Sequence, residues 1–251
     1  MRVAVLTGAS SGIGATVARE LAGRAWLCVL IARREERLRA LAEELDAEYE
    51  VCDVGDRAAV EATAARVLKR HAQVKLLVNS AGISGRADFF SGDPERIEGV
   101  MRTNYLGSVW CLRAFLPALQ AARPSDVVNI VSIAGLVAFP PSGPYSASKH
   151  AQLAFSRATS ASLRRGGISV HTVNPGFVET EGFPQRTVLR SAFFRRAVIE
   201  PDVVARHIVG LVGGPPRETV IPRFYRPAGV LQAVAPNLVA RLVARRSGLY
   251  R

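Results

Sequence analysis

Two side chains in the middle of the chain have the types and the spacing of an acid–base pair. Tyr145 and Lys149 lie four positions apart, so both side chains share one face if the segment is helical. A tyrosine with its reference pKa of about 10 is a poor base at neutral pH, and lowering that pKa to about 7 takes roughly 4 kcal/mol. The ammonium of Lys149 can supply part of this in a site partly screened from water. The pair predicts a tyrosine that exchanges a proton with a substrate oxygen.

The choice of lysine at position 149 is itself informative. Lys69, Lys75 and Lys149 are the only lysines among 33 basic residues, and the others are arginines. An arginine would serve any general surface role, so a lysine here suggests that a compact ammonium is needed. The alternative is an ordinary exposed tyrosine and lysine.

A glycine-rich turn near the N-terminus has the composition of a phosphate-binding loop. Residues 7–14 read TGASSGIG between an apolar strand pattern and a helical pattern. Gly8 permits a tight turn, Gly12 lets the backbone approach a pyrophosphate, and Gly14 lets the following helix pack closely. Glycines close many such loops for structural reasons, so this turn is weak evidence by itself.

The elements that must position these residues are those of an α/β protein. Short runs of Val, Ile and Leu alternate with longer Ala/Arg/Glu segments of helical period, the pattern of a parallel sheet with crossover helices. Strands are predicted at 3–6, 27–31, 49–52, 76–79, 127–131, 169–173 and 219–221. Helices are predicted at 13–23, 34–45, 57–71, 94–123, 145–165 and 201–212, the fourth being broken or late to begin.

The fold class is therefore α/β: a single doubly wound Rossmann-type domain with a seven-stranded, mainly parallel sheet and helices on both faces. We assign residues 1–225 to this catalytic domain and residues 226–251 to a C-terminal amphipathic helical extension. Ligands of such sheets bind beyond the carboxyl ends of the strands, and the motifs above fall there.

The composition fits an ordinary globular protein. Hydrophobic residues are 49% and charged residues 22% of the 251 residues, enough apolar material for a core. The net charge of +12 is scattered without a basic stripe interleaved with aromatics, so we expect no nucleic-acid partner. Cys28, Cys52 and Cys111 lack the paired spacing of a zinc site, and we expect no metal. No apolar run reaches about 18 residues and a strand pattern begins at Val3, so we expect a cytoplasmic location.

Taken with these motifs, the sequence resembles the short-chain dehydrogenase/reductase family. The family's T-G-x-x-x-G-x-G pattern matches residues 7–14, and its Y-x-x-x-K pair matches Tyr145 and Lys149. Residues 79–82 read NSAG where the family usually has N-N-A-G, so Ser80 departs from the pattern. The resemblance runs from residue 3 to about residue 222, with five motifs in order. It implies an oxidoreductase that moves a hydride between nicotinamide and a carbonyl or alcohol carbon.

The resemblance also implies roles for further residues. Asn104, Ser132, Tyr145 and Lys149 match the catalytic tetrad, in which the serine orients the substrate oxygen, the asparagine anchors a water and the lysine also holds the nicotinamide ribose. Asn104 as a helix N-cap or kink is the alternative. Cofactor contacts are expected from the glycine turn, the strand ends and the loop after the sixth strand: Gly8, Ser10, Ser11, Gly12, Ile13, Gly14, Arg33, Arg34, Asp53, Val54, Asn79, Ala81, Gly82, Tyr145, Lys149, Pro175, Gly176, Val178 and Thr180.

The end of the second predicted strand indicates which nicotinamide cofactor is bound. An acid there would bind the ribose hydroxyls of NAD, but residues 31–34 read IARR. An arginine in this position can pair with the 2′-phosphate of NADP while its plane stacks on adenine. Two solvated arginines that open a helix are the alternative, although positive charge at a helix N-terminus is unfavourable. We expect NADP, with Arg33 as the principal contact and Arg34 as the secondary one.

The expected activity is NADPH-linked reduction of a carbonyl compound. Its rival is a catalytically idle regulatory or membrane-surface binding protein that keeps the fold, and the complete tetrad favours the enzyme. The loops after the fifth and sixth strands are apolar, which suggests a bulky, lipid-like substrate or, alternatively, loop or subunit packing. Their apolar residues are Leu136, Val137, Phe139 and Pro140, then Phe177, Phe183, Val188, Leu189, Phe193 and Phe194.

The resemblance also implies a homo-oligomer, a dimer or a tetramer. Family members commonly pair the two long helices that correspond here to residues 104–123 and 145–165. Leu153 and Phe155 on the second of these helices would then be covered by the partner.

The C-terminal segment carries its own helix signals. Pro236 could open a helix and Gly248 close it. Its apolar stripe packs on the chain itself or on a neighbouring subunit, or makes a weak contact with an anionic membrane. The stripe consists of Leu238, Val239, Leu242 and Val243, with Asn237, Arg241, Arg245 and Arg246 as polar neighbours.

Overall fold

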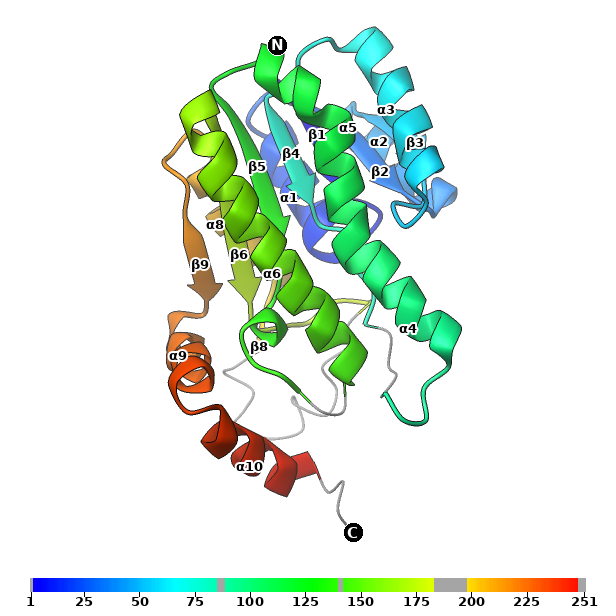
Figure 1. Ribbon diagram of the computed structural model, residues 1–251. Helices are drawn as coiled ribbons and strands as arrows, with labels where there is room; N and C mark the ends of the chain where they lie inside the picture. The colour runs from blue at the N-terminus through cyan, green and yellow to red at the C-terminus, as the bar shows by residue number, and fades with distance from the viewer. Residues whose placement is uncertain (1, 85–88, 140–141, 183–197, 248–251) are drawn as a thin grey trace.

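One parallel sheet organises the molecule. The computed structural model describes residues 2–84, 89–139, 142–182 and 198–247 (Figure 1). Seven strands pair in the order β3-β2-β1-β4-β5-β6-β9, and every pairing is parallel. They are β1 (Arg2–Thr7), β2 (Trp26–Ala32), β3 (Glu48–Val51), β4 (Leu76–Asn79), β5 (Ser125–Ile130), β6 (Ile168–Pro175) and β9 (Glu218–Ile221). All seven predicted strands are confirmed. The separate pair β7 (Phe177–Val178) and β8 (Val198–Ile199) was not predicted, because two residues carry no periodicity.

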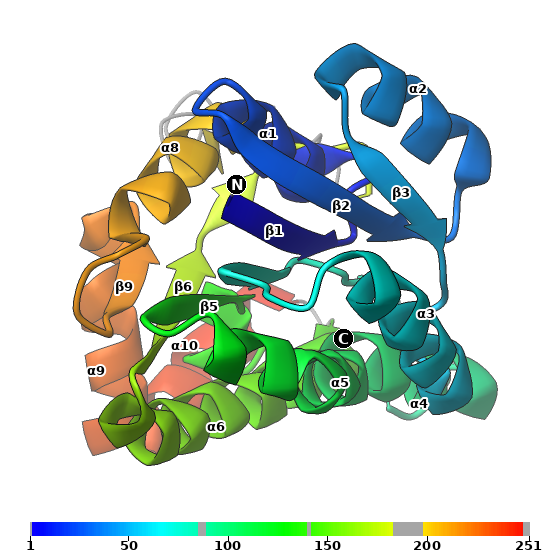
Figure 2. The ribbon, with the colours of Figure 1, turned by 90° about the horizontal axis from the view of Figure 1, so that it is seen from above.

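Helices cover both faces of the sheet (Figure 2). One face carries α1 (Gly12–Ala22), α2 (Glu35–Leu45) and α8 (Pro201–Leu211). The other carries α3 (Arg57–Arg70), α5 (Gly107–Ala121) and α6 (Gly143–Leu163). Strand side chains alternate between the two cores, so Leu6 and Val5 of β1 lie in opposite clusters and both are fully buried. Burial on both faces is why the strands read as continuous apolar runs.

The fourth predicted helix begins at Pro94 and is not broken, but it contains an irregular turn. α4 (Pro94–Met101) passes into a π-helical turn, Arg102–Leu106, before α5 continues the run. A π-helical turn inserts one extra residue per turn and is frequent at functional sites. Asn104 lies in the middle of this turn and is fully buried.

The C-terminal segment forms two helices rather than one. A 3₁₀ turn, Arg223–Tyr225, leads into α9 (Arg226–Val234), which was not predicted, and then into α10 (Pro236–Ser247). The predicted helix start at Pro236 is confirmed, whereas Gly248 lies outside the described residues. The predicted single stripe is wrong, because Val239 is buried while Leu238 and Leu242 are exposed. Both helices lie beyond the carboxyl ends of β6 and β9 (Figure 1).

Leu153 and Phe155, which were expected to be covered by a second subunit, pack against residues of the same chain. Leu153 is buried, and Phe155 is partly buried against the core below α5 and meets the Tyr105 ring edge-on at 6.4 Å. They therefore give no support to an oligomer. No helix in the described part of the chain has the length and apolarity needed to cross a bilayer.

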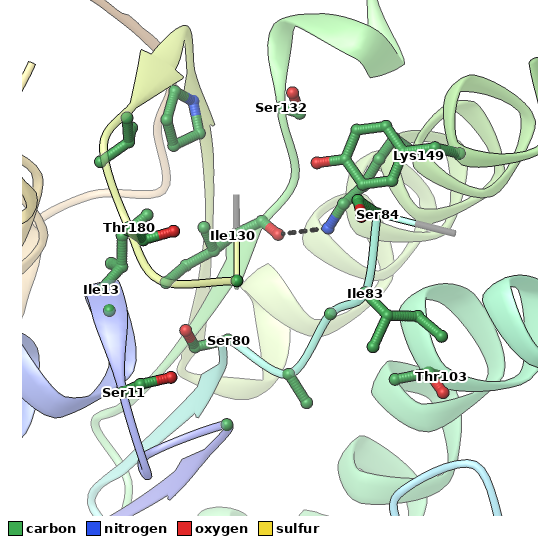
Figure 3. Close-up of a pocket in the computed structure, with 18 of the residues that line it drawn as sticks. Ser11, Ile13, Ser80, Ile83, Ser84, Thr103, Ile130, Ser132, Lys149 and Thr180 are labelled. Atoms are coloured by element: carbon green, nitrogen blue, oxygen red, sulfur yellow. Dashed lines mark hydrogen bonds between the residues drawn. The ribbon is translucent and has the colours of Figure 1, made fainter. Parts of the chain in front are cut away.

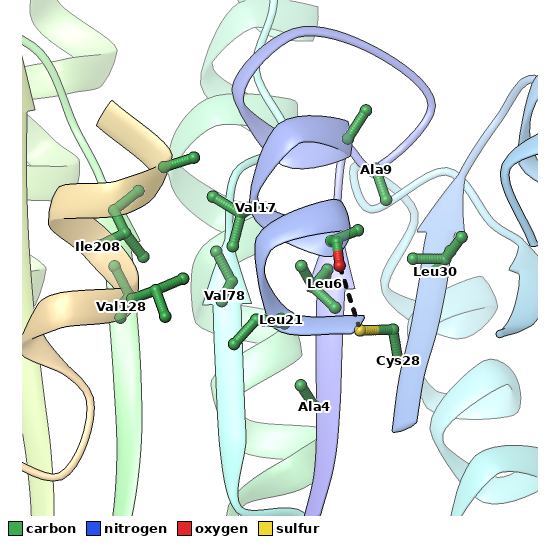
Figure 4. Close-up of a cluster of buried hydrophobic side chains, with 14 of the residues drawn as sticks. Ala4, Leu6, Ala9, Val17, Leu21, Cys28, Leu30, Val78, Val128 and Ile208 are labelled. Atoms are coloured by element: carbon green, nitrogen blue, oxygen red, sulfur yellow. Dashed lines mark hydrogen bonds between the residues drawn. The ribbon is translucent and has the colours of Figure 1, made fainter. Parts of the chain in front are cut away.

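Ile208 of α8 tests the packing that holds the outer helices on the sheet. It is fully buried beside Val17 of α1 and Val128 of β5 (Figure 4). We expect Ile208→Ala to lower the free energy of unfolding by about 2–5 kcal/mol, because it leaves a cavity among side chains that cannot collapse fully. Val203→Ala on the same helix is the control, because Val203 is exposed and its loss should change stability by about 0.5 kcal/mol or less. Equal midpoints in urea for the two variants would contradict this packing.

Candidate active site

A cavity of about 630 Å³ opens at the carboxyl ends of the strands and brings most predicted residues together. It lies within the usual size range of small-molecule sites. Of the predicted catalytic residues, Ser132, Tyr145 and Lys149 line it, and Asn104 lies behind its wall. All predicted cofactor residues line it except Gly14 and Asn79, which are buried and do not reach its surface. Figure 3 shows how Ser11, Ser80 and Thr180 face the same space from three different strand ends.

The glycine turn is held in place by the loop after β4. Gly8 has a φ of +65°, and a Cβ there would lie 2.7 Å from the Cα of Ala81, so no other residue fits. The Thr7 hydroxyl oxygen accepts hydrogen bonds from the backbone N–H groups of Ser80 and Ala81, at 3.1 and 3.2 Å. A Cβ at Gly14 would meet the carbonyl oxygen of Gly8 at 2.4 Å, which confirms that this glycine allows α1 to pack on the turn. Thr7 was not predicted.

The two arginines after β2 have different surroundings. Arg34 donates to the Ser10 hydroxyl at 3.1 and 3.0 Å and also to the Ser11 hydroxyl. Arg33 forms an ion pair with Asp53 at 3.5 Å, and both of these side chains are about half exposed. Arg34 is thus fixed against the glycine turn, while Arg33 lies beside the loop after β3. Sequence reasoning ranked Arg33 first because it cannot see side-chain direction.

Tyr145 and Ser132 line the cavity side by side and are hydrogen-bonded to each other. Ser132 follows β5 in extended backbone and caps the short 3₁₀ turn Ile133–Gly135, where its hydroxyl accepts a hydrogen bond from the N–H of Ala134 at 3.1 Å. Tyr145 stands in the first turn of α6. Burial raises the pKa of Tyr145 to about 12, and a hydrogen bond with Ser132 acts in the opposite direction. The side chain therefore holds its proton at neutral pH.

Lys149 is buried, and its ammonium donates two hydrogen bonds to the chain. Nζ donates to the carbonyl oxygen of Ile130 at 3.0 Å, as Figure 3 shows, and to Oε1 of Gln152 at 2.8 Å. Burial lowers the pKa of Lys149 to about 7. Nζ lies 5.8 Å from the centre of the Tyr145 ring. The expected lowering of the Tyr145 pKa by Lys149 is therefore not what the structure shows, because the ammonium bonds to the backbone and to an amide.

Asn104 joins the wall of the cavity to α6. Its Oδ1 accepts from the N–H of Ile83 at 2.8 Å, and its Nδ2 donates to the carbonyl oxygen of Ile83 and to the Ser148 hydroxyl, each at 3.0 Å. Asn104 is not a helix N-cap, because it lies inside the π-helical turn. The same residue also fixes the loop that carries Gly82 and Ile83.

Gln152 and Ser108 are site residues that sequence reasoning missed. Gln152 binds the ammonium through its carbonyl oxygen and donates from Nε2 to the Ser108 hydroxyl at 2.8 Å. Ser108 in turn donates to the backbone carbonyl of Asn104 at 3.4 Å. A buried chain of polar groups thus runs from Lys149 to the π-helical turn. The available signal was an amide three positions after the lysine, on the same helix face.

Of the apolar residues predicted in the loops after the fifth and sixth strands, two line the cavity. Phe139 and Phe177 line it, whereas Val137 is buried elsewhere and Leu136 packs beneath Gly229 of α9. The expectation that Leu136 and Val137 contact the substrate is therefore wrong. The other predicted loop residues lie outside the described residues: Pro140, Phe183, Val188, Leu189, Phe193 and Phe194. Within the described ranges, no group of three or more His, Cys, Asp or Glu side chains could hold a metal ion.

Comparison with known proteins identifies the family. Residues 2–187 match the profile described as short chain dehydrogenase. The chain belongs to this family. It is 31% identical over 266 residues to dehydrogenase/reductase SDR family member 7B of Bos taurus, covering 98% of this chain and 81% of the relative. It is 32% identical over 240 residues to farnesol dehydrogenase of Aedes aegypti, covering 91% and 96%. Actinorhodin polyketide ketoreductase with NADPH has a similar structure, with a TM-score of 0.80, 30% identity, and coverage of 88% and 95%.

Membership makes the chain an oxidoreductase that acts between alcohol and carbonyl groups with a nicotinamide cofactor. The described residues fit such a cofactor at both ends. Gly12 and Ile13 line the cavity where the positive end of the α1 dipole would meet phosphates. At the other end, Tyr145 and Lys149 line the same cavity, where they could meet the nicotinamide and its ribose.

The contact between Gln152 and Lys149 generates a prediction that does not depend on turnover. Gln152→Leu should lower the pKa of Lys149 by roughly one pH unit, because it removes a hydrogen bond that stabilises the ammonium by about 1.5 kcal/mol. Gln152→Glu should raise that pKa, because it places a carboxylate beside the charge. The pKa is measured from the lysine Cε and Nζ chemical shifts, and only three lysines contribute.

Ser156→Ala is the matched control for this titration. Ser156 is buried on α6 and hydrogen-bonds to Asn129 and Thr172, without contacting Lys149. Its loss should leave the titration of Lys149 in place. If Gln152→Leu and Gln152→Glu shifted the pKa of Lys149 in the same direction, the amide would act through general packing instead.

Proposed function

We propose that the protein is an NADPH-dependent carbonyl reductase whose proton donor is Tyr145. The single observation that carries the proposal is that Tyr145, hydrogen-bonded to Ser132, lines one cavity with Lys149 and the glycine turn. The phenol of Tyr145 is protonated at neutral pH, so it carries the proton that a carbonyl oxygen needs on reduction. The reductive direction is part of the proposal.

Each side chain has a distinct task in this proposal. Bound NADPH would supply the hydride. The Ser132 hydroxyl orients the carbonyl oxygen, and Tyr145 donates its proton to that oxygen as negative charge develops there. The ammonium of Lys149 would hold the ribose hydroxyls of the bound cofactor and raise the local positive potential, while Asn104 keeps the loop at Ile83 in place. A catalytically idle protein would have no need of this buried charge, which is costly to maintain.

The preference for NADPH rests on the charge at the end of β2. Arg33 and Arg34 line the cavity, and Arg34 is already oriented by two serine hydroxyls. Guanidinium groups recognise phosphate with short, charge-assisted hydrogen bonds. The structurally similar ketoreductase is named as a complex with NADPH, which supports the same choice.

The substrate that we propose is a bulky, apolar carbonyl compound. Phe139 and Phe177 line the cavity, and large apolar side chains there favour an apolar ligand. The relative named farnesol dehydrogenase is consistent with a lipid-like substrate. We propose a cytoplasmic location, with which the three free, buried cysteines agree. Homo-oligomer formation is proposed from the family resemblance alone.

The cofactor preference is tested by titration with NADPH and NADH, followed by nicotinamide fluorescence. We expect much tighter binding of NADPH, and we expect Arg33→Ala and Arg34→Ala each to erode the preference by about 1.5–3 kcal/mol, the contribution of a hydrogen bond to a charged group. Arg39→Ala is the control, because Arg39 is exposed on α2 and does not line the cavity. Equal affinities of the unmodified protein for both cofactors would refute the assignment.

The proton donor is tested with Tyr145→Phe. We expect turnover to be abolished while NADPH affinity stays nearly unchanged, because the variant loses one hydroxyl and little volume. Lys149→Ala should reduce both, since it removes the charge and a cofactor contact. The assay uses NADPH oxidation with a panel of apolar ketones and aldehydes. An unaltered rate for Tyr145→Phe on the best substrate would show that another group donates the proton.

A further inference from the structure

The exposed apolar surface of the protein is concentrated in one short segment. Ten large hydrophobic residues are exposed in the described ranges, and six of them lie between positions 224 and 242. Scattered exposed hydrophobic residues need no explanation, but a contiguous group indicates an interaction site. The six are Phe224, Val230, Leu231, Val234, Leu238 and Leu242.

Helical geometry gathers these residues into stripes. Val230 and Val234 are four residues apart on α9, and Leu238 and Leu242 are four apart on α10, so each pair lies on one helix face. Val234 is 74% exposed and Val230 is 62% exposed. Val239, next to this pair on α10, is buried. α10 therefore packs on the protein through Val239, while the two exposed pairs on α9 and α10 stay open.

The charge of the same segment has one sign. Residues 219–251 contain six arginines and neither an aspartate nor a glutamate. Arg223, Arg226 and Arg241 are exposed among the six apolar residues, and we call these nine residues the tail surface. A second copy docked symmetrically on this surface would bring arginines against arginines. An anionic bilayer complements both the apolar stripes and the charge.

We propose that the tail surface docks on an anionic lipid bilayer. Apolar side chains of α9 and α10 enter the boundary of headgroups and acyl chains, and the arginines meet lipid phosphates. α9 packs on Leu136, since a Cβ at Gly229 would meet that side chain at 3.2 Å. The residue before α9, Tyr225, packs on Gly176 of the cavity wall, where a Cβ would overlap its ring, so α9 begins beside the cavity. A route for a lipid-dissolved substrate rests on the proposed function, whereas the docking itself does not.

The experiment is sedimentation of the full chain with phosphatidylglycerol-containing vesicles and with pure phosphatidylcholine vesicles. We expect the protein to pellet with the anionic vesicles at low salt and to be released at high salt, because screening shortens the Debye length to a few ångströms. Pure phosphatidylcholine should bind it far more weakly. Binding that is independent of lipid charge would overturn the proposal.

Two sets of variants at exposed positions separate the two parts of the surface. Replacing Arg223, Arg226 and Arg241 by Ala should weaken the vesicle partition coefficient about a hundredfold, since each arginine near an anionic surface contributes roughly fivefold. Val234→Ser with Leu238→Ser should weaken it about tenfold or more. The charge control is the triple variant at Arg39, Arg96 and Arg113, and the apolar control is Val51→Ser with Val203→Ser; all are exposed elsewhere.

The outcomes separate docking from enzymatic function and from self-association. NADPH titration of every variant should match the unmodified protein, so a failure of docking leaves the cofactor assignment unaffected. Full-length protein that stays in the supernatant at low salt overturns the proposal, as does equal loss of binding in the control variants. If Val234→Ser with Leu238→Ser instead converts an oligomer to a monomer in light scattering, the surface is a subunit contact and the membrane proposal is wrong.

Discussion

The buried ammonium of Lys149 is the constraint on which the arrangement of the site depends. Removing a cation from water costs several kcal/mol, so the chain must bring acceptors to it. One acceptor is the carbonyl oxygen of Ile130, which is available because β5 ends there. The other is the amide of Gln152, one turn further along α6, which is oriented in turn by Ser108 of α5. The positions of β5, α5 and α6 are thus coupled through a single charge.

The π-helical turn before α5 belongs to the same arrangement of contacts. The extra residue turns Asn104 inward, where it binds both backbone groups of Ile83 and the Ser148 hydroxyl. The backbone carbonyl of Asn104 receives the Ser108 hydroxyl, which closes the polar chain back to Lys149. A regular helix would place this residue about 100° away from the loop it now binds. The same burial moves two pKa values apart: Tyr145 and Lys149 have similar ordinary values, but here they lie at about 12 and about 7.

The sequence was sufficient for the features that depend on local periodicity. All seven strands of the sheet were predicted, because burial on both faces leaves continuous apolar runs, and the Tyr145–Lys149 pair was found because its spacing is helical. Contacts between distant segments could not be predicted. Thr7 binds the loop after β4, and Gln152 binds Ser108, across 73 and 44 positions of the chain. Only the three-dimensional fold brings these partners together, so no rule based on sequence spacing predicts them.

The two arginines after β2 show how such non-local contacts change a prediction. Arg34 is held by Ser10 and Ser11, so its guanidinium is oriented before any ligand arrives and loses little conformational entropy on binding. Arg33 is paired with Asp53, but an ion pair between half-exposed side chains contributes about 1 kcal/mol or less. A phosphate group can accept two parallel hydrogen bonds from a guanidinium, which is stronger than the single contact with this carboxylate at 3.5 Å. Arg34 also lies 3.6 Å from a carboxylate oxygen of Glu181, so both arginines have an acidic neighbour. What distinguishes Arg34 is the additional hold of the two serine hydroxyls, which makes it the preorganised contact of the pair.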